Sequence, residues 1–170
     1  MSHPFPTPKS ITGGCLCNAL RYRADFPADH NFETGSSTCQ CTQCRKQTGS
    51  LFFSYQTVTP SAAFQWISPS TSTLKLYQAS PMAERAFCGD CGSFIYWKAK
   101  DSDRVSFTLG TVDPLYLFGE GADGKEVPEG GFGMALANGG GEHSWCKNEI
   151  KGVTDEASLG FMKKGTRTEE

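Results

Sequence analysis

The chain has 170 residues, of which 38% are hydrophobic and 12% aromatic, so it can build the core of one folded domain. Its 16 basic and 18 acidic side chains give a net charge of −2, whereas proteins that bind phosphate backbones are usually basic, so we expect no nucleic-acid partner. No apolar run approaches the roughly 18 residues that a membrane span needs, and the first residues show no signal-peptide pattern. We therefore expect no membrane partner and a cytoplasmic location.

Short apolar stretches separated by turn residues follow a lead-in, residues 1–10, that contains three prolines and is expected to be flexible. Several stretches are of strand length and alternate apolar with polar residues, a pattern typical of half-buried strands. We predict strands near residues 20–24, 51–55, 62–67, 73–77, 93–97 and 105–109. Short helices are predicted only over residues 42–48 and in the tail. The chain is therefore predicted to be mainly β.

After the lead-in, the composition divides the chain into four parts. Residues 11–118 contain the predicted strands and are expected to form the core of the domain. Residues 119–141 contain nine glycines and are interpreted as a glycine-rich loop or insertion. Residues 142–162 are expected to complete the same domain, and residues 163–170 to form a frayed tail.

Seven of the eight cysteines fall into three groups, which in a reducing compartment favours metal binding over disulfides. On an extended chain, Cys15 and Cys17 would point to the same side. Cys88 and Cys91 have the spacing of a zinc knuckle, with Gly89 and Gly92 supplying the backbone freedom of its turn. The third group consists of Cys39, Cys41 and Cys44.

A structural zinc takes four protein ligands, while a catalytic zinc takes three and keeps a position for water or substrate. Seven thiols divide naturally into Cys15, Cys17, Cys88 and Cys91 on the one hand and Cys39, Cys41 and Cys44 on the other. Other pairings remain open from the residues alone, as do a single structural zinc and a set of buried reduced cysteines. Outside these groups, Cys146 is interpreted as a small buried hydrophobic residue, and no ligand spacing relates His3, His30 or His143 to the clusters.

The motifs resemble those of the glutathione-dependent formaldehyde-activating enzyme family, and the resemblance extends from about Ile11 to Asp113. It rests on Gly13-Gly14-Cys15-Leu16-Cys17, Cys39-Gln40-Cys41-Thr42-Gln43-Cys44, Phe87-Cys88-Gly89-Asp90-Cys91-Gly92 and Gly110-Thr111-Val112-Asp113. The resemblance implies an Mss4-like fold of several small antiparallel sheets organised around zinc, with two zinc ions per chain. It implies that Cys15, Cys17, Cys88 and Cys91 hold a structural zinc and that Cys39, Cys41 and Cys44 hold a catalytic one. Two positions depart from the family pattern, with Gln40 where His is frequent and Asn18 where Gly is usual.

The function implied by the resemblance is that of a carbon–sulfur lyase, acting on an adduct between glutathione, or another small thiol, and an aldehyde. Arg45 and Lys46 directly follow the third cysteine of the central group, and we expect them to contact the ligand's carboxylates, although a solvated basic pair fits equally well. The alternative is a non-enzymatic Mss4-like interaction module, which needs only the four-cysteine site. A chromatin role, as in centromere protein V-like relatives, is disfavoured because the chain has no basic patch. The sequence does not specify the oligomeric state.

Overall fold

The computed structural model describes residues 5–123 and 125–155. The chain divides into two compact units: a larger one of Met1–Ser37 and Ser54–Glu142, and a smaller one of Thr38–Phe53 and His143–Glu170. Cys15, Cys17, Cys88 and Cys91 lie in the larger unit, and Cys39, Cys41 and Cys44 in the smaller one. Each of these two sets of cysteines is therefore complete within one unit.

The larger unit contains a three-stranded antiparallel sheet in the order β1-β2-β5, in which β2 is central. Its strands are β1 (Ser10–Gly14), β2 (Arg21–Asp25) and β5 (Phe64–Trp66). Ile11 pairs with Ala24 and Tyr22 with Trp66, and the alternation of β1 and β2 buries Ile11, Tyr22 and Ala24 completely.

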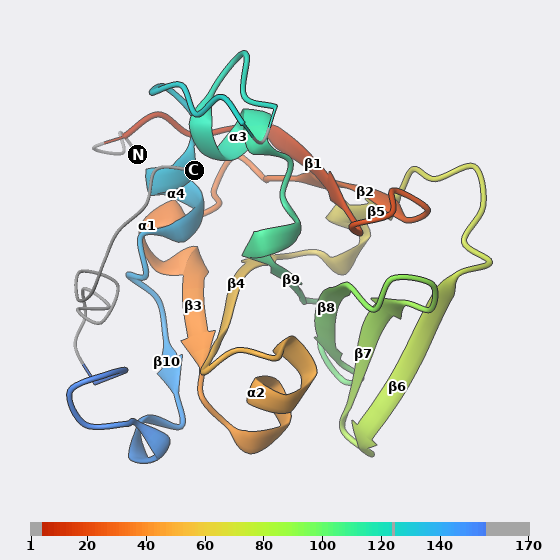
Figure 1. The fold of residues 1–170 in the computed structure, drawn as a ribbon, viewed down its shortest axis with the longest axis vertical. Coiled ribbons are helices and arrows are strands. Elements are labelled where there is room, and N and C mark those ends of the chain that lie inside the picture. The colour runs from red at the N-terminus through yellow and green to blue at the C-terminus, as the bar shows by residue number, and fades with distance from the viewer. Residues whose placement is uncertain (1–4, 124, 156–170) are drawn as a thin grey trace. The chain divides into compact units, whose positions relative to one another are not determined.

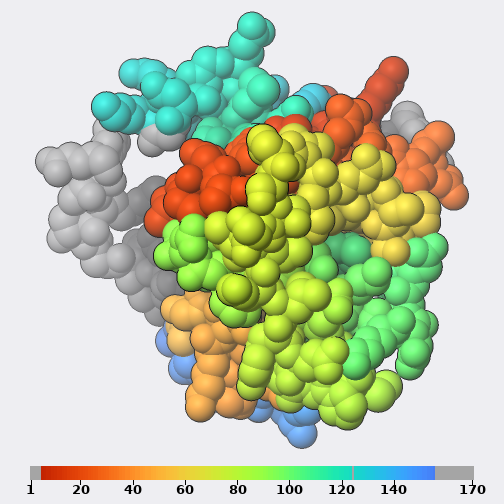
Figure 2. Space-filling model, turned by 90° about the vertical axis from the view of Figure 1, so that its right-hand side faces the viewer, coloured from red at the N-terminus to blue at the C-terminus, as the bar shows by residue number. Residues whose placement is uncertain are grey.

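A second antiparallel arrangement in the larger unit has the order β4-β9-β8-β7-β6 (Figure 1). Its strands are β4 (Phe53–Val58), β6 (Leu74–Ser80), β7 (Ala83–Cys88), β8 (Phe94–Ala99) and β9 (Val105–Thr108). Strand register aligns Phe107, Tyr96 and Ala86 in one buried row. Strand β6 ends the order, and Figure 2 shows it on the surface.

One apolar cluster draws side chains from both sheets of the larger unit. Tyr22 of the first sheet stacks on Phe64 with ring centroids 4.7 Å apart, and Phe64 meets Tyr96 of the second sheet edge-on at 5.6 Å. These aromatic rings therefore join the two sheets of the larger unit. The prediction of a mainly β fold with small antiparallel sheets is confirmed.

The helices are short. The larger unit has α1 (Phe32–Gly35), α3 (Pro114–Phe118), α4 (Gly133–Ala137) and the 3-10 turns η1 (Ser61–Ala63) and η2 (Leu109–Thr111). The smaller unit has α2 (Thr42–Thr48), the strand β10 (His143–Ser144) and the 3-10 turn η3 (Cys146–Asn148), and β10 pairs in parallel with the end of β3 (Ser36–Cys39). Among the helices of residues 5–123 and 125–155, none has the length and apolar character needed to cross a bilayer.

The predicted strands near residues 20–24, 51–55, 62–67, 73–77, 93–97 and 105–109 correspond to β2, β4, β5, β6, β8 and β9, and the helix predicted over 42–48 is α2. Strands β1, β3 and β7 were not predicted, because glycine, serine or charged residues interrupt their apolar pattern, and neither was β10, which has only two residues. The predicted tail helix and residues 163–170 lie outside the described residues, as do residues 1–4 of the lead-in.

Among its described residues, the glycine-rich stretch 119–141 contains one element, α4, that the composition did not predict. Ala135 and Leu136 of this helix are completely buried in the apolar cluster. Asn138 of the same stretch forms a hydrogen bond to α1, because its side chain donates to the Phe32 carbonyl at 2.8 Å. A helix of five residues between glycines gives no periodic signal, so only its burial reveals it.

Candidate metal centres

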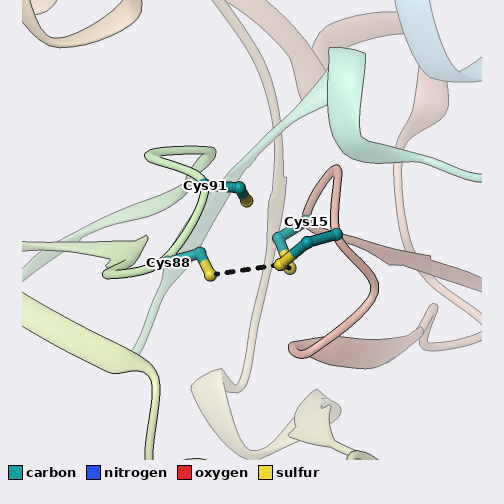
Figure 3. A group of neighbouring side chains, drawn as sticks. Cys15, Cys88 and Cys91 are labelled. Atoms are coloured by element: carbon teal, nitrogen blue, oxygen red, sulfur yellow. Dashed lines mark hydrogen bonds between the residues drawn. The ribbon is translucent and has the colours of Figure 1, made fainter.

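Four sulfurs meet where two turns of the larger unit face each other, and we name Cys15, Cys17, Cys88 and Cys91 the tetrad (Figure 3). Cys15 and Cys17 follow strand β1, and Cys88 and Cys91 flank the turn between β7 and β8. The Sγ atoms of Cys15 and Cys17 are 3.5 Å apart, and Cys17 reaches Cys88 across 3.7 Å. All four sulfurs lie within 4.8 Å of one another.

Both turns are tight. Gly92 has φ of 76°, which a residue with a side chain rarely adopts, and its amide donates to the Cys88 carbonyl at 2.9 Å. The Cys15–Cys17 segment is a turn and not the extended chain that we expected, because the Asn18 amide donates back to the Cys15 carbonyl at 3.0 Å. Asn18 occupies the left-handed region with φ of 61°, a conformation that asparagine tolerates better than most residues.

Hydrogen bonds from the surrounding chain reach the tetrad sulfurs. The Leu20 amide donates to Cys15 Sγ at 3.2 Å. Ser93 Oγ lies 3.3 Å from Cys91 Sγ and accepts a hydrogen bond from the Leu16 amide at 2.9 Å. Because the Leu16 amide can only donate, the Ser93 hydroxyl proton is available for the Cys91 sulfur. Ser93 thus connects the two turns that carry the tetrad.

The thiols of the tetrad differ in the direction in which their surroundings shift the pKa. Burial raises the pKa of Cys91, but hydrogen bonds from Ser93 outweigh it and lower this pKa to about 5. The Ala19 amide favours the thiolate of Cys17, yet contact with the sulfurs of Cys15 and Cys91 raises the pKa of Cys17 to about 12. Several thiolates this close repel one another, which a bound dication would offset.

The second cluster is Cys39, Cys41 and Cys44, which we name the triad, and its sulfurs also lie within 4.8 Å of one another. Cys39 ends β3, while Cys41 is the N-cap of α2 and its sulfur accepts from the Cys44 amide at 3.3 Å. The helix ends after seven residues at Gly49, whose φ of 65° provides the left-handed C-cap. Contact with the Cys39 sulfur, together with burial, raises the pKa of Cys44 well above its usual range.

Both clusters fit zinc. A tetrahedron with Zn–S bonds of 2.3 Å has edges of about 3.8 Å, close to the 3.5 Å and 3.7 Å separations in the tetrad. Thiolates are the ligands that zinc prefers in structural sites. Among the described residues, no fourth ligand atom joins the triad. The structure thus selects the division into four and three thiols from the pairings that the sequence left open.

The other candidate residues are not members of either sulfur cluster. Arg45 is half-buried and Lys46 is exposed, both in the last turn of α2, where cations also complement the helix dipole. Among the described histidines, neither His30 nor His143 joins a cluster, and His3 lies outside the described residues. The prediction that Cys146 is buried is wrong: it is exposed on η3, and its Sγ donates to the His143 carbonyl at 3.1 Å.

Two contacts near the clusters escaped the sequence analysis. Arg21 and Asp113 form a two-pronged ion pair, with one N–O distance of 2.8 Å, and Thr12 donates to the same carboxylate. In the smaller unit, the buried Gln40 accepts from the Thr154 hydroxyl at 2.7 Å. These partners are 92 and 114 residues apart, and only a motif at one end, such as the Gly110–Asp113 signature, could have hinted at them.

Comparison with known proteins gives this geometry a context. Residues 10–123 match the glutathione-dependent formaldehyde-activating enzyme family. This match covers more than half of the chain and includes all seven clustered cysteines. The chain belongs to the glutathione-dependent formaldehyde-activating enzyme family. The family match ends before β10 and η3.

Individual relatives of this family member are distant. A Schizosaccharomyces pombe protein named an uncharacterized lyase is 31% identical over 86 residues, which make up 50% of this chain and 55% of that protein. The chain thus spans about half the length of this curated relative. A crystal structure of a Rhodobacter sphaeroides protein has a TM-score of 0.49 and 20% identity, and the similarity covers 71% of this chain and 100% of that one.

Proposed function

We propose that this member of the glutathione-dependent formaldehyde-activating enzyme family is a zinc-dependent carbon–sulfur lyase. Its substrate would be an adduct of glutathione, or another small thiol, with an aldehyde such as formaldehyde. The observation that carries the proposal is the triad, which offers three sulfurs and, among the described residues, no fourth protein ligand. A zinc ion held by three protein ligands keeps a position for a substrate.

The tetrad supports a different role for a second zinc ion. It provides a complete set of four thiols from two turns, and Cys15 and Cys88 are almost fully buried. A closed four-thiolate site has no position for a substrate, so this ion would stabilise the fold.

In the reaction that we propose, the sulfur of the thiol forms a bond to the carbonyl carbon of the aldehyde. The thiol gives up its proton and the carbonyl oxygen gains one; the lyase direction is the reverse, in which the carbon–sulfur bond breaks. Zinc held by Cys39, Cys41 and Cys44 would supply a Lewis acid that favours the ionised thiol. Arg45 follows Cys44 directly and is half-buried, so its guanidinium is the first candidate to hold a ligand carboxylate, with Lys46 as the second.

Metal analysis tests the division of the cysteines. Protein purified without chelators should contain two zinc ions per chain, and mild chelation should remove the triad ion first because only three thiols of the chain hold it. Thiol alkylation with mass mapping would show which cysteines become reactive at each step. A single zinc ion, with Cys39, Cys41 and Cys44 freely alkylated, would contradict the proposed lyase site.

Calorimetry tests the ligand. Glutathione at millimolar concentration should bind to the zinc-loaded protein and release a proton as its thiol ionises, so the heat should vary with the ionisation enthalpy of the buffer. Binding should weaken as salt screens the carboxylates. A protein with two zinc ions that binds neither glutathione nor a simpler thiol would favour the interaction-module alternative.

A further inference from the structure

The segment that begins at β10 is hydrogen-bonded to both backbone groups of Gln40, the residue between Cys39 and Cys41 of the triad. Ser144 pairs with Cys39 in the parallel β3–β10 register. The Gln40 amide donates to the Ser144 carbonyl at 3.0 Å, and the Asn148 side chain donates to the Gln40 carbonyl at 3.3 Å. The turn between Ser144 and Asn148 therefore lies directly beside the residue that separates two triad cysteines.

The side chain of Gln40 fixes the same segment farther along. Only 5% of Gln40 is exposed, and its side-chain oxygen accepts from the Thr154 hydroxyl at 2.7 Å. The Thr154 hydroxyl in turn accepts from the Ile150 amide at 3.0 Å. Both ends of the 144–154 segment thus have fixed positions relative to the triad.

Trp145, the first residue of this turn, has an unfavourable backbone. Its φ of 65° and ψ of 38° are left-handed, a conformation that is unfavourable for a residue with a side chain. Glycine would adopt this conformation without that cost. Burial does little to offset it, because 53% of Trp145 is exposed. The sequence thus keeps a large, exposed indole where the backbone favours glycine.

Lys147 completes a recognition surface with this indole. Its ammonium nitrogen lies 5.1 Å from the centroid of the Trp145 ring, within the range of a cation–π contact. Both residues are exposed, so the pair offers a positive charge and an aromatic face together. Such a pair suits a ligand that carries a carboxylate next to an aliphatic chain.

We propose that Trp145 and Lys147 form the ligand-contacting wall of the triad centre and bind the carboxylate-bearing chain of an anionic thiol. The inference rests on the proposed function of the triad and adds a specificity surface to it, outside the part of the chain that the family match covers. Glutathione has two carboxylates, so Arg45 and Lys147 can each bind one. Uncharged thiols would use the triad alone.

The test measures affinity and stability together on the full-length, zinc-loaded chain. Glutathione and the uncharged thiol 2-mercaptoethanol are titrated by calorimetry into wild type and into Trp145→Gly, Trp145→Phe and Lys147→Ala. Lys151→Ala is the matched control, since Lys151 is an exposed lysine of the same segment. Melting temperatures are recorded in parallel.

Trp145→Gly should raise the melting temperature by a few degrees and weaken glutathione binding at least fivefold. Trp145→Phe should keep most of the affinity because it keeps an aromatic face. Lys147→Ala should weaken glutathione severalfold and reduce the salt dependence of its binding, while leaving 2-mercaptoethanol and the Lys151→Ala control unchanged.

Four results would contradict the inference. Trp145→Gly with a lower melting temperature and unchanged affinity would assign the indole to packing alone. Equal losses in Lys147→Ala and Lys151→Ala would mean that only overall charge matters. Wild-type protein with two zinc ions and no affinity for glutathione would overturn the proposed ligand and this wall with it, whereas normal wild-type binding with unaffected variants would overturn the wall alone.

Discussion

The tetrad gathers its sulfurs from two turns that lie 71 residues apart, whereas the triad takes all three sulfurs from residues 39–44. An ion at the tetrad would close a long loop of the chain, because it would join two turns that are carried by different strands. An ion at the triad would bridge only the end of β3 at Cys39 and the start of α2, which are separated in the chain by just Gln40 and Cys41. The two centres should therefore differ in how much they stabilise the fold. A metal ion that crosslinks distant segments stabilises the fold, while an ion that links neighbouring residues leaves the fold less dependent on its metal.

Cys88→Ser should have the largest effect. Cys88 is completely buried and contacts Cys17 across the two turns. Structural zinc contributes on the order of 10 kcal/mol in small zinc peptides, and whole domains are stable by only about 5–15 kcal/mol. We expect most of the protein to be unfolded or aggregated, as circular dichroism and gel filtration would show. A variant that melts like wild type would remove the distinction between the two centres.

Cys41→Ser should leave the fold in place. Serine is a favoured N-cap, so its hydroxyl can replace the sulfur that accepts from the Cys44 amide. We expect the melting temperature to fall by less than about 5 °C, one zinc ion to be lost and lyase activity to disappear. Stability losses equal to those of Cys88→Ser would mean that the ligands are divided wrongly.

Asp113→Asn tests a contact that supports the tetrad side of the molecule. Burial alone would raise the pKa of Asp113, but hydrogen bonds from Arg21 and Thr12 outweigh it and lower this pKa. A carboxylate with a lowered folded-state pKa contributes stability above its ordinary pKa of about 4. That contribution disappears as the pH falls through the lower, folded-state value.

Removing the carboxylate leaves Arg21 without its partner, so we expect Asp113→Asn to lose about 1–3 kcal/mol at pH 7. The difference from wild type should shrink below about pH 4. Thermal melts from pH 7 to pH 3 would measure it. Asp25→Asn is the matched control, because its pair with Arg23 is exposed to solvent and should contribute little to stability. Equal losses in both variants, or a difference that grows in acid, would contradict this assignment.

Ser93→Ala should have the smallest effect on stability, about 1 kcal/mol, because it removes one hydroxyl. Its particular consequence concerns the metal: without the hydrogen bond to Cys91, zinc should transfer severalfold faster to a colorimetric chelator. Ser68→Ala is a matched control, since the Ser68 hydroxyl accepts from the Arg21 amide at 2.6 Å and donates to the Arg21 carbonyl at 3.3 Å, both of them backbone groups. Equal zinc release from the two variants would leave Ser93 with a structural role only.

Much of the fold could be predicted because its signals are local. The alternation in β2 and β9 identified strands, and the helix over residues 42–48 agrees in both bounds with α2. The spacing of Cys41 and Cys44 places two ligands one helical turn apart, so their proximity follows from the helix itself. Strand β7 was not predicted because charged residues interrupt its apolar pattern. Its pairing with β6 and β8 is what identifies it as a strand.

By itself, the sequence determined the three groups of thiols, the local geometry of the triad and the mainly β class, since each depends on neighbours within a few residues. The tertiary structure decided which groups combine, because Cys17 and Cys88 meet only through strand pairing across 71 residues. It also decided the burial of Leu136 and the exposure of Cys146, and it joined Gln40 to Thr154. Burial and long-range hydrogen bonds depend on how distant segments pack, and no local pattern encodes that packing.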